Sequence, residues 1–236
     1  MTKETQLPID TVLFDLDGTL IDSMPELAYC SNQSLEEMGR EPLPLETLST
    51  FVGKGLERLI IRFLANDINA TVAEPELLKE AKKVFSRHYH ANNGLFSELY
   101  PTVIETLEQL KANNFKLAVV TNKALEFTLP LLEKKGLSQY FNVVIGGDSC
   151  EQKKPHPAPV FLALKKLNSS ADTAVFVGDS LNDALAAKAA GLPCLMLPYG
   201  YNEGQAISEP ETGALIDNLH ATIDWINAEN AKRKGN

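Results

Sequence analysis

The sequence predicts an α/β protein with a Rossmann-like parallel sheet as its core and an inserted all-helical cap. Two observations lead to this fold class. From Tyr100 onward, strand-like and helix-like stretches alternate, which is typical of a parallel sheet covered by helices on both faces. Before Tyr100, one strand-like stretch is followed by a long region with only helical periodicity. We therefore expect a core formed by residues 1–21 and 95–236 and a cap formed by residues 22–94.

The apolar stretch of residues 12–14 is the first expected strand, and it runs into Asp15 and Asp17. Alternate residues of a strand point to the same face, so we expect these two carboxylates to lie side by side. Gly18 then allows a sharp turn. An Asp-Gly pair also occurs in β-hairpins, which is the alternative here. Residues 21–25 favour the start of a helix instead, with cap candidates and a proline in the first turn.

Three apolar stripes at helical spacing predict the helices of the cap. Gly39 ends the first helix, and residues 92–94 (Asn-Asn-Gly) end the third. Because this segment leaves the core just after Asp17, we expect it to act as a lid over that site. The members of the stripes are, in order, Leu27, Cys30, Ser31, Leu35 and Met38; Leu56, Leu59, Ile60, Phe63 and Leu64; and Leu77, Leu78, Ala81, Val84, Phe85 and Tyr89.

After Tyr100 we expect strands and helices in alternation. Pro130 lies inside one expected helix, which should kink or restart there. The strands are expected over residues 115–120, 141–145, 174–177 and 192–197. The first expected helix begins at Pro101, and the second ends at about Lys135, where Gly136 closes it. The other helices are expected over residues 158–167, over residues 181–190 with Gly191 closing that helix, and around Trp225.

The composition excludes some classes of function. The chain has 236 residues and a formal net charge of −9, with a pI near 5.0, which argues against nucleic acid or an anionic membrane as a partner. No stretch has the length of a membrane span, and the first residues lack the apolar core of a signal peptide. The three cysteines form no CxxC pair, which is typical of reduced thiols. We expect a cytoplasmic protein, monomeric or homodimeric.

Polar residues follow the other expected strands, at the edge where open parallel sheets bind ligands. Each has a structural alternative, because Thr and Asp commonly cap helices and loop lysines are commonly solvated. Their gathering at one edge of one sheet favours a catalytic site. The residues are Thr121 and Asn122, then Lys153 and Lys154, then Asp179 and Asp183.

Four motifs, in order, resemble those of the haloacid-dehalogenase-like (HAD) superfamily. They are Asp15-Leu-Asp17-Gly-Thr-Leu, Thr121-Asn-Lys, Lys154-Pro-His-Pro and Gly178-Asp179-Ser-Leu-Asn-Asp183. The resemblance spans nearly the whole chain, including a helical cap after the first motif. Within the superfamily the chain most resembles the bacterial phosphoglycolate phosphatases, through residues 99–101, 154–159 and 199–204. Thr102 departs from the pattern, because relatives usually carry glycine there.

The resemblance implies hydrolysis of a phosphomonoester through an aspartyl-phosphate. Asp15 would be the nucleophile, which needs no base because a carboxylate is ionised at neutral pH. Asp17 would be the general acid. Lys154, with Lys153 as the alternative, would neutralise charge on the nucleophile and the phosphoryl group, and Thr121 would bind phosphoryl oxygens.

The resemblance also implies a Mg²⁺ cofactor. Asp15, Asp179 and the backbone carbonyl of Asp17 would be its protein ligands, with Asp183 supporting them from outside the metal's own ligands. Gly18, Thr19 and Asn122 would contact the substrate. Oxygen ligands without a thiolate or histidine cluster favour Mg²⁺ over Zn²⁺.

Substrate choice would come from the cap. Lys54, between Gly53 and Gly55, is the candidate contact, and an ordinary turn with an exposed lysine is the alternative. The expected partner is a small phosphorylated metabolite, with phosphoglycolate as the first choice. The other functions are another small-molecule phosphatase of the superfamily, or a sugar phosphomutase of the β-phosphoglucomutase type that uses the same aspartyl chemistry. A non-catalytic binding domain is a third class.

Overall fold

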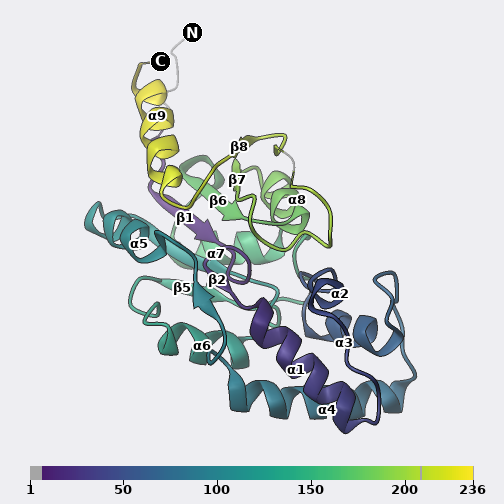
Figure 1. Cartoon of the computed structure of the whole chain (residues 1–236). Helices are drawn as coiled ribbons and strands as arrows, with labels where there is room; N and C mark the ends of the chain where they lie inside the picture. Colours follow the sequence, from purple (N-terminus) through teal and green to yellow (C-terminus); the bar gives the residue numbers. More distant parts are fainter. Residues whose placement is uncertain (1–6, 208, 236) are drawn as a thin grey trace.

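The computed structural model describes residues 7–207 and 209–235. Its centre is a six-stranded sheet in the order β5-β4-β1-β6-β7-β8, in which neighbouring strands are parallel (Figure 1). The α/β fold with a parallel sheet is therefore confirmed. The strands are β1 (Thr11–Phe14), β4 (Lys116–Val120), β5 (Val143–Ile145), β6 (Ala174–Gly178), β7 (Cys194–Met196) and β8 (Gly213–Leu215).

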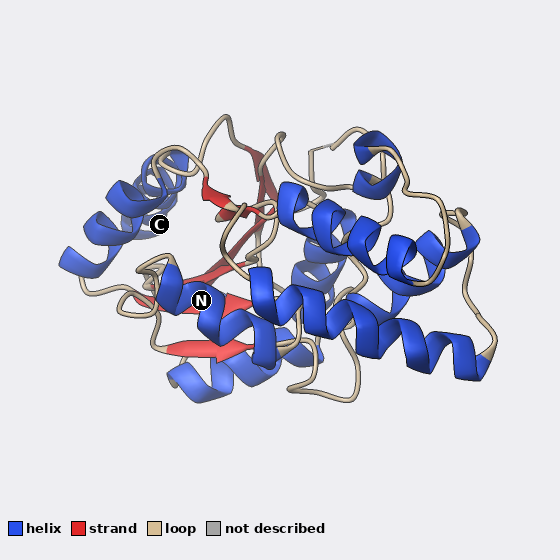
Figure 2. Cartoon of the chain, turned by 60° about the horizontal axis from the view of Figure 1, so that its bottom comes forward, coloured by secondary structure: helices blue, strands red, loops and turns tan. Residues whose placement is uncertain are grey.

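Both faces of the sheet are buried, and successive residues of a strand pack in different cores. In β1, Val12 and Phe14 belong to one core and Leu13 to the other. Figure 2 shows the strands with helices on either side. Burial on both faces explains the near-continuous apolar character of these strands. The first core includes α5 (Val103–Ala112), α6 (Leu125–Lys134) and α9 (Ala221–Gly235), and the second includes α7 (Ala158–Leu167) and α8 (Leu181–Ala190).

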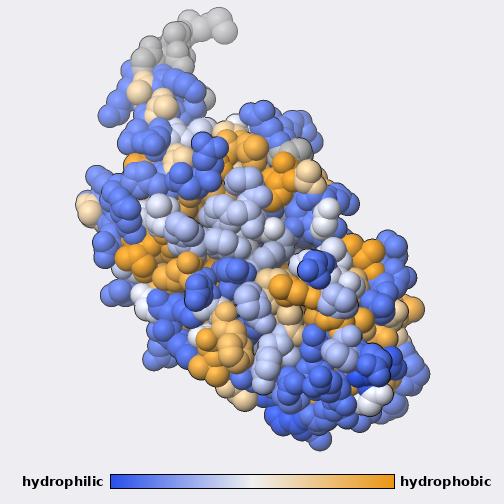
Figure 3. Space-filling view, in the orientation of Figure 1, coloured by the Kyte–Doolittle hydropathy of each residue, from blue (hydrophilic) through white to orange (hydrophobic). Residues whose placement is uncertain are grey.

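The four helices between β2 (Ile21–Asp22) and β3 (Glu98–Leu99) lie together at the end of the molecule opposite α9 (Figure 1). They enclose a third core, to which Phe127 of α6 also belongs. Figure 3 shows mainly hydrophilic residues over the outer end of this group, so the predicted apolar stripes turn inward. We keep residues 22–94 as the proposed cap. The helices are α1 (Met24–Glu37), α2 (Leu45–Ser49), α3 (Leu56–Ala65) and α4 (Pro75–Asn92).

The chain around the first motif differs from the prediction. Strand β1 ends at Phe14, so Asp15 and Asp17 follow the strand and do not alternate within it. Residues 21–22, at the beginning of the expected helix start, form the short strand β2 (Ile21–Asp22), which pairs antiparallel with β3 (Glu98–Leu99). Helix α1 begins at Met24, with Ser23 at the N-cap position and a proline in the first turn, so the helix start expected within residues 21–25 is confirmed. The pairing satisfies backbone groups of the two connections to the cap, and a contact so distant in sequence leaves no local pattern.

The remaining differences concern short elements and element ends. Three strands begin later than expected, and α2, β8 and the 3-10 turn Ala171–Thr173 were not predicted because each has only three to five residues. Helix α6 continues through Pro130 without a restart, because buried Phe127 and Leu131 hold it in place despite the missing N–H. The three cysteines are free, and Cys30 and Cys194 are buried. No helix of residues 7–207 and 209–235 is long and apolar enough to cross a bilayer.

Candidate active site

Three strands end at one edge of the sheet and bring the motifs together. β1 lies between β4 and β6 in parallel register. Asp15 follows β1, Thr121 follows β4, and Asp179 follows β6. Because parallel strands share a carboxyl edge, the three side chains meet there, and all three line one cavity.

Asp15 is held through one of its carboxylate oxygens. Oδ1 accepts a hydrogen bond from the backbone N–H of Leu16 at 2.7 Å and lies 2.9 Å from Lys154 Nζ. Oδ2 is therefore the oxygen left to react with a bound ligand. Only 1% of the Lys154 side chain is exposed, whereas Lys153 is an exposed residue. The structure therefore places Lys154, and not Lys153, beside Asp15.

Asp183 holds both Lys154 and the loop of Asp179. Its Oδ1 accepts a hydrogen bond from Lys154 Nζ at 2.6 Å. Its Oδ2 accepts from the N–H of Asp179 at 3.2 Å, and from the N–H and Oγ of Ser180 at 3.0 and 2.7 Å. The contacts with Ser180 form a capping box at the start of α8. Asp183 is fully buried and does not line the cavity, so it is suited to orient its neighbours and not to bind a ligand itself.

Asp179 is held by residues that are far apart in the sequence. Thr19 Oγ1 donates to its Oδ1 and the N–H of Tyr201 donates to its Oδ2, each at 2.6 Å. A Cβ added at Gly18 or Gly200 would lie 2.2 or 2.1 Å from Oδ2, so only glycine fits at either position. Thr19, expected to contact the substrate, is fully buried against Asp179. Its contact with substrate remains a prediction.

The acidic cluster fits a divalent cation. Carboxylate oxygens of Asp15, Asp179 and Asp183 lie within 4.8 Å of one another. Burial raises the pKa of Asp15 to about 7, although Lys154 acts in the opposite direction. Burial, and then the charges of Asp183 and Asp15, raise the pKa of Asp179 well above its ordinary value. A cation would relieve this repulsion, and oxygen ligands suit a hard ion.

Asp17 pairs with a residue to which the sequence pattern assigned no function. Lys123 Nζ donates to Asp17 Oδ1 at 2.6 Å, and only 5% of the Lys123 side chain is exposed. Lys123 lies in the turn after β4, where its backbone N–H donates to Thr121 Oγ1 at 3.2 Å. The signal was present in the sequence, because Lys123 is the third residue of the Thr121-Asn-Lys motif.

Asn122 links the core to the proposed cap. Its Nδ2 donates to the backbone oxygens of Gly53, at 3.0 Å, and of Lys154, at 2.9 Å, and its Oδ1 accepts from the N–H of Lys154 at 2.9 Å. Asn182 Nδ2 donates to the same oxygen of Gly53 at 3.4 Å. Asn122 lines the cavity, but these contacts occupy its amide group. Its expected contact with the substrate remains a prediction.

Lys54 lies in the same loop of the cap and is paired with an acid. Its Nζ is 2.9 Å from Glu203 Oε2, and Glu203 Oε1 is 2.6 Å from Arg62 Nη2. Gly53 and Gly55 line the cavity, whereas Lys54 does not. A contact between Lys54 and the substrate therefore remains a prediction, and it requires a change of partner.

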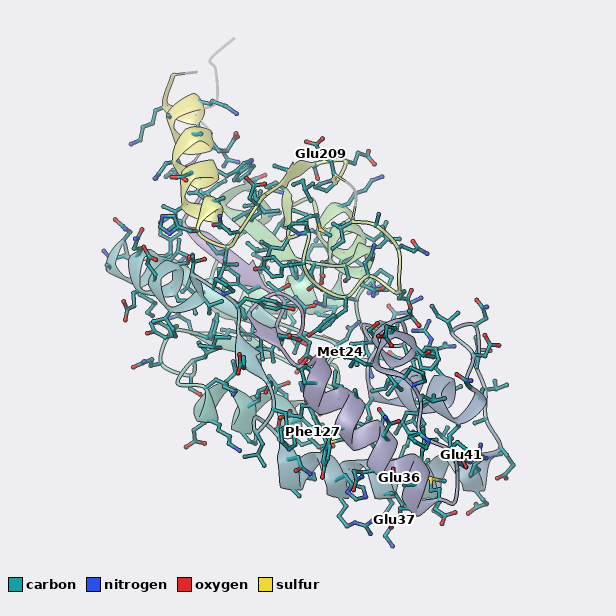
Figure 4. The ribbon with its side chains drawn as sticks, viewed as in Figure 1. Met24, Glu36, Glu37, Glu41, Phe127 and Glu209 are labelled. Atoms are coloured by element: carbon teal, nitrogen blue, oxygen red, sulfur yellow. The ribbon has the colours of Figure 1, made fainter. Side chains whose placement is uncertain are left out.

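The cavity lies between the carboxyl edge of the sheet and the helices of the proposed cap. Its volume is about 60 Å³, which is room for roughly four to six water-sized groups. Tyr201 also lines it, and the N–H of Met24 donates to the Tyr201 hydroxyl at 3.0 Å. Figure 4 shows Met24 at the end of α1 nearest the sheet, with Glu36 and Glu37 at the far end. The cap residues in the wall are Leu27, Val52, Gly53, Gly55, Leu56, Leu59, Phe85 and Tyr89.

Two comparisons with solved structures agree with this architecture. A crystal structure of a predicted phosphoglycolate phosphatase from Haemophilus somnus 129pt superimposes with a TM-score of 0.85 and 34% identity, covering 92% of this chain and 97% of that chain. A crystal structure of CbbY from Rhodobacter sphaeroides in complex with phosphate superimposes with a TM-score of 0.75 and 26% identity, covering 90% of this chain and 95% of that chain.

Sequence comparison identifies the family. The chain is 44% identical to a phosphoglycolate phosphatase of Nitrosospira multiformis over 220 aligned residues. The alignment covers 93% of this chain and 96% of that protein. Residues 12–197 match the model of the haloacid dehalogenase-like hydrolases. With this match and the four motifs at one sheet edge, the chain belongs to the haloacid dehalogenase-like hydrolase family.

Proposed function

We propose that this protein is a phosphoglycolate phosphatase, which hydrolyses 2-phosphoglycolate to glycolate and phosphate through an aspartyl-phosphate on Asp15. The observation that carries the proposal is the pairing of Asp15, which lines the small cavity, with the buried Lys154. A carboxylate that has one oxygen bound by donors and the other free can attack phosphorus without a general base.

The first step transfers the phosphoryl group to the protein. Asp15 Oδ2 attacks phosphorus, and the bond between phosphorus and the ester oxygen breaks. Lys154, held by Asp183, offsets negative charge on the nucleophile and the transferring group. Thr121 accepts a hydrogen bond through its oxygen, so its hydroxyl proton is available to a phosphoryl oxygen.

Asp17 is the proton donor of the first step and the proton acceptor of the second. It lines the cavity two residues after Asp15, and Lys123 occupies its Oδ1. In the first step it gives a proton to the leaving alkoxide, which yields glycolate. In the second step it takes a proton from water, whose oxygen attacks the phosphorus of the aspartyl-phosphate and regenerates Asp15.

Mg²⁺ is the proposed cofactor. Asp15 and Asp179, together with the backbone carbonyl of Asp17, would hold it, and Asp183 would keep the loop of Asp179 in place. When bound, the ion supplies positive charge that lowers the repulsion between a carboxylate and a phosphate dianion.

The choice of substrate rests on two observations. Over nearly the whole chain, a 44% identical relative is named a phosphoglycolate phosphatase, and a 34% identical solved structure is named a predicted phosphoglycolate phosphatase. The cap residues of the cavity wall are also mostly apolar and offer few partners for the several hydroxyl groups of a hexose phosphate. The proposal therefore places phosphoglycolate ahead of a sugar phosphate.

Phosphate release from purified protein with Mg²⁺ tests the proposal. We expect kcat/KM for 2-phosphoglycolate to exceed that for glucose 1-phosphate and for nitrophenyl phosphate by at least about tenfold. The Asp15→Asn variant is the control for a contaminating phosphatase. Conversion of glucose 1-phosphate to glucose 6-phosphate without phosphate release would indicate a mutase and would overturn the proposal.

A further inference from the structure

Lys123 lies where the core and the proposed cap meet. It follows β4, and its ammonium is 2.6 Å from Asp17 Oδ1 on the core side. On the cap side it lies 5.1 Å from the centre of the Tyr89 ring of α4. An ammonium carries three N–H donors, and the contact with Asp17 uses one of them. The side chain can therefore bind a second acceptor without releasing Asp17.

The other cations near the site are paired or lie outside the cavity wall, and Lys153, which lies near Gly55, is exposed and does not line the cavity. Lys154 contacts Asp15 and Asp183. Lys54 and Arg62 both contact Glu203, and neither lines the cavity. Among the residues of the cavity wall within 7–207 and 209–235, Lys123 is the cationic one. An anionic group of the ligand that reaches beyond the phosphoryl site meets this ammonium.

No side chain on the cap side of the described cavity wall carries a positive charge, and the Tyr89 hydroxyl is the polar side-chain group there. Leu27, Leu56, Leu59 and Phe85 are apolar, and a carboxylate placed against them without a partner would be strongly unfavourable. The position of Lys123 also matches the length of the substrate. In phosphoglycolate, one methylene separates the ester oxygen from the carboxylate, so a cation in contact with the acid Asp17 lies close to that carboxylate.

We propose that Lys123 binds the carboxylate of the substrate and so selects 2-phosphoglycolate over neutral phosphate esters. The inference rests on the proposed function and adds a specificity-determining residue to it. The alternative is that Lys123 only positions Asp17 for proton transfer. The two roles differ in one respect: a carboxylate contact matters only to a substrate that has a carboxylate.

The test compares 2-phosphoglycolate with its amide, 2-phosphoglycolamide, which keeps the shape and the alkoxide leaving group but lacks the charge. The wild-type protein should prefer the acid by roughly tenfold to a hundredfold in kcat/KM, the loss expected for one charge-assisted contact. Lys123→Met should lose that preference, so that its loss of kcat/KM is roughly tenfold to a hundredfold larger for the acid than for the amide. Lys123→Arg, which keeps the charge, should keep part of the preference.

The controls separate charge from folding. Lys188→Met removes one exposed lysine, paired with Glu211, and should leave both rates unchanged. Both substrates are measured on the same preparation, so the ratio of their rates does not depend on the folded fraction. If Lys123→Met does not fold, the wild-type ratio still decides, because equal rates on acid and amide would overturn the inference.

The remaining outcomes of the comparison also test the inference. Equal losses on both substrates in Lys123→Met would show that Lys123 acts through Asp17, and an unchanged preference would remove it from recognition; either result overturns the inference. A wild-type protein that hydrolyses the amide but not phosphoglycolate would contradict the proposed function itself. That failure is visible before any variant is made.

Discussion

Lys154 and Asp183 form a buried ion pair, with Nζ 2.6 Å from Oδ1 and 1% and 0% of their side chains exposed. The same ammonium lies 2.9 Å from Asp15. Asp183 also caps α8 and binds the N–H of Asp179, so one carboxylate fixes two parts of the site at once. A change in either partner should therefore affect both stability and catalysis.

Lys154→Met should abolish phosphate release and lower the free energy of unfolding by roughly 3–5 kcal/mol. The variant leaves Asp15 and Asp183 buried without their shared cation. Lys153→Met, one residue earlier and exposed, is the matched comparison and should leave the urea midpoint unchanged. Steady-state kinetics and urea unfolding of both variants check this. A larger effect at Lys153 would reverse our choice between the two lysines.

Thr102→Gly should stabilise the protein. Thr102 precedes α5 with φ of +66°, a left-handed conformation that is unfavourable for a β-branched residue. Thr102→Ala is the matched variant, because it also removes the hydroxyl but keeps a Cβ. We expect Thr102→Gly to be about 1 kcal/mol more stable than Thr102→Ala in thermal unfolding, with kcat unchanged. Equal stability of the two variants would show that this conformation carries no strain.

Most of the core could be predicted from the sequence, because β1, β4 and β6 are apolar runs followed by polar residues at the carboxyl edge. Asp15, Thr121, Lys154 and Asp179 were found in this way, and the structure brings all four together. The functions assigned to them remain proposals. Alternation of strands and helices predicts a parallel sheet with a shared carboxyl edge, whereas the strand order that makes these residues neighbours was not predicted.

The remaining features depend on contacts between distant segments. The pairing of β2 with β3 joins residues that are far apart in sequence, so no local sequence pattern predicts it. Lys123 was overlooked because its partner, Asp17, lies 106 residues away. Lys54 was chosen for its glycine-flanked loop, but Glu203 lies beside it in the fold.

Mg²⁺ should stabilise the protein more at high pH than at low pH. The pKa of Asp15 is about 7 in the metal-free fold, above its ordinary value of 3.8. Between these values the unfolded chain loses a proton that the folded protein keeps, so the metal-free protein loses stability as pH rises, and the penalty is complete above about 7. Mg²⁺ binds the ionised carboxylate and should remove that penalty.

Thermal unfolding with Mg²⁺ or with a chelator measures this effect. The rise in Tm caused by Mg²⁺ should be larger at about pH 8 than at about pH 5.5. Asp179→Asn, which removes a proposed ligand, should reduce the rise at both pH values. An equal rise at the two pH values would place the ion away from Asp15.

Lys54→Ala should alter two substrates to the same extent. Lys54 pairs with Glu203, and 40% of its side chain is exposed, so the pair contributes little. We expect kcat/KM for phosphoglycolate and for nitrophenyl phosphate to change by less than about threefold each. A loss confined to phosphoglycolate would instead show that Lys54 leaves Glu203 and contacts the substrate, as the sequence suggested.

The central claim is that Asp15 carries the phosphoryl group during turnover. Borohydride reduces an aspartyl-phosphate to homoserine, which peptide mass spectrometry locates in the chain. Protein quenched with borohydride during turnover of phosphoglycolate should contain homoserine at position 15, in an amount that depends on substrate and Mg²⁺. The Asp15→Asn variant should show none. Phosphate release without any modification at position 15, or with the modification at Asp17, would contradict the account.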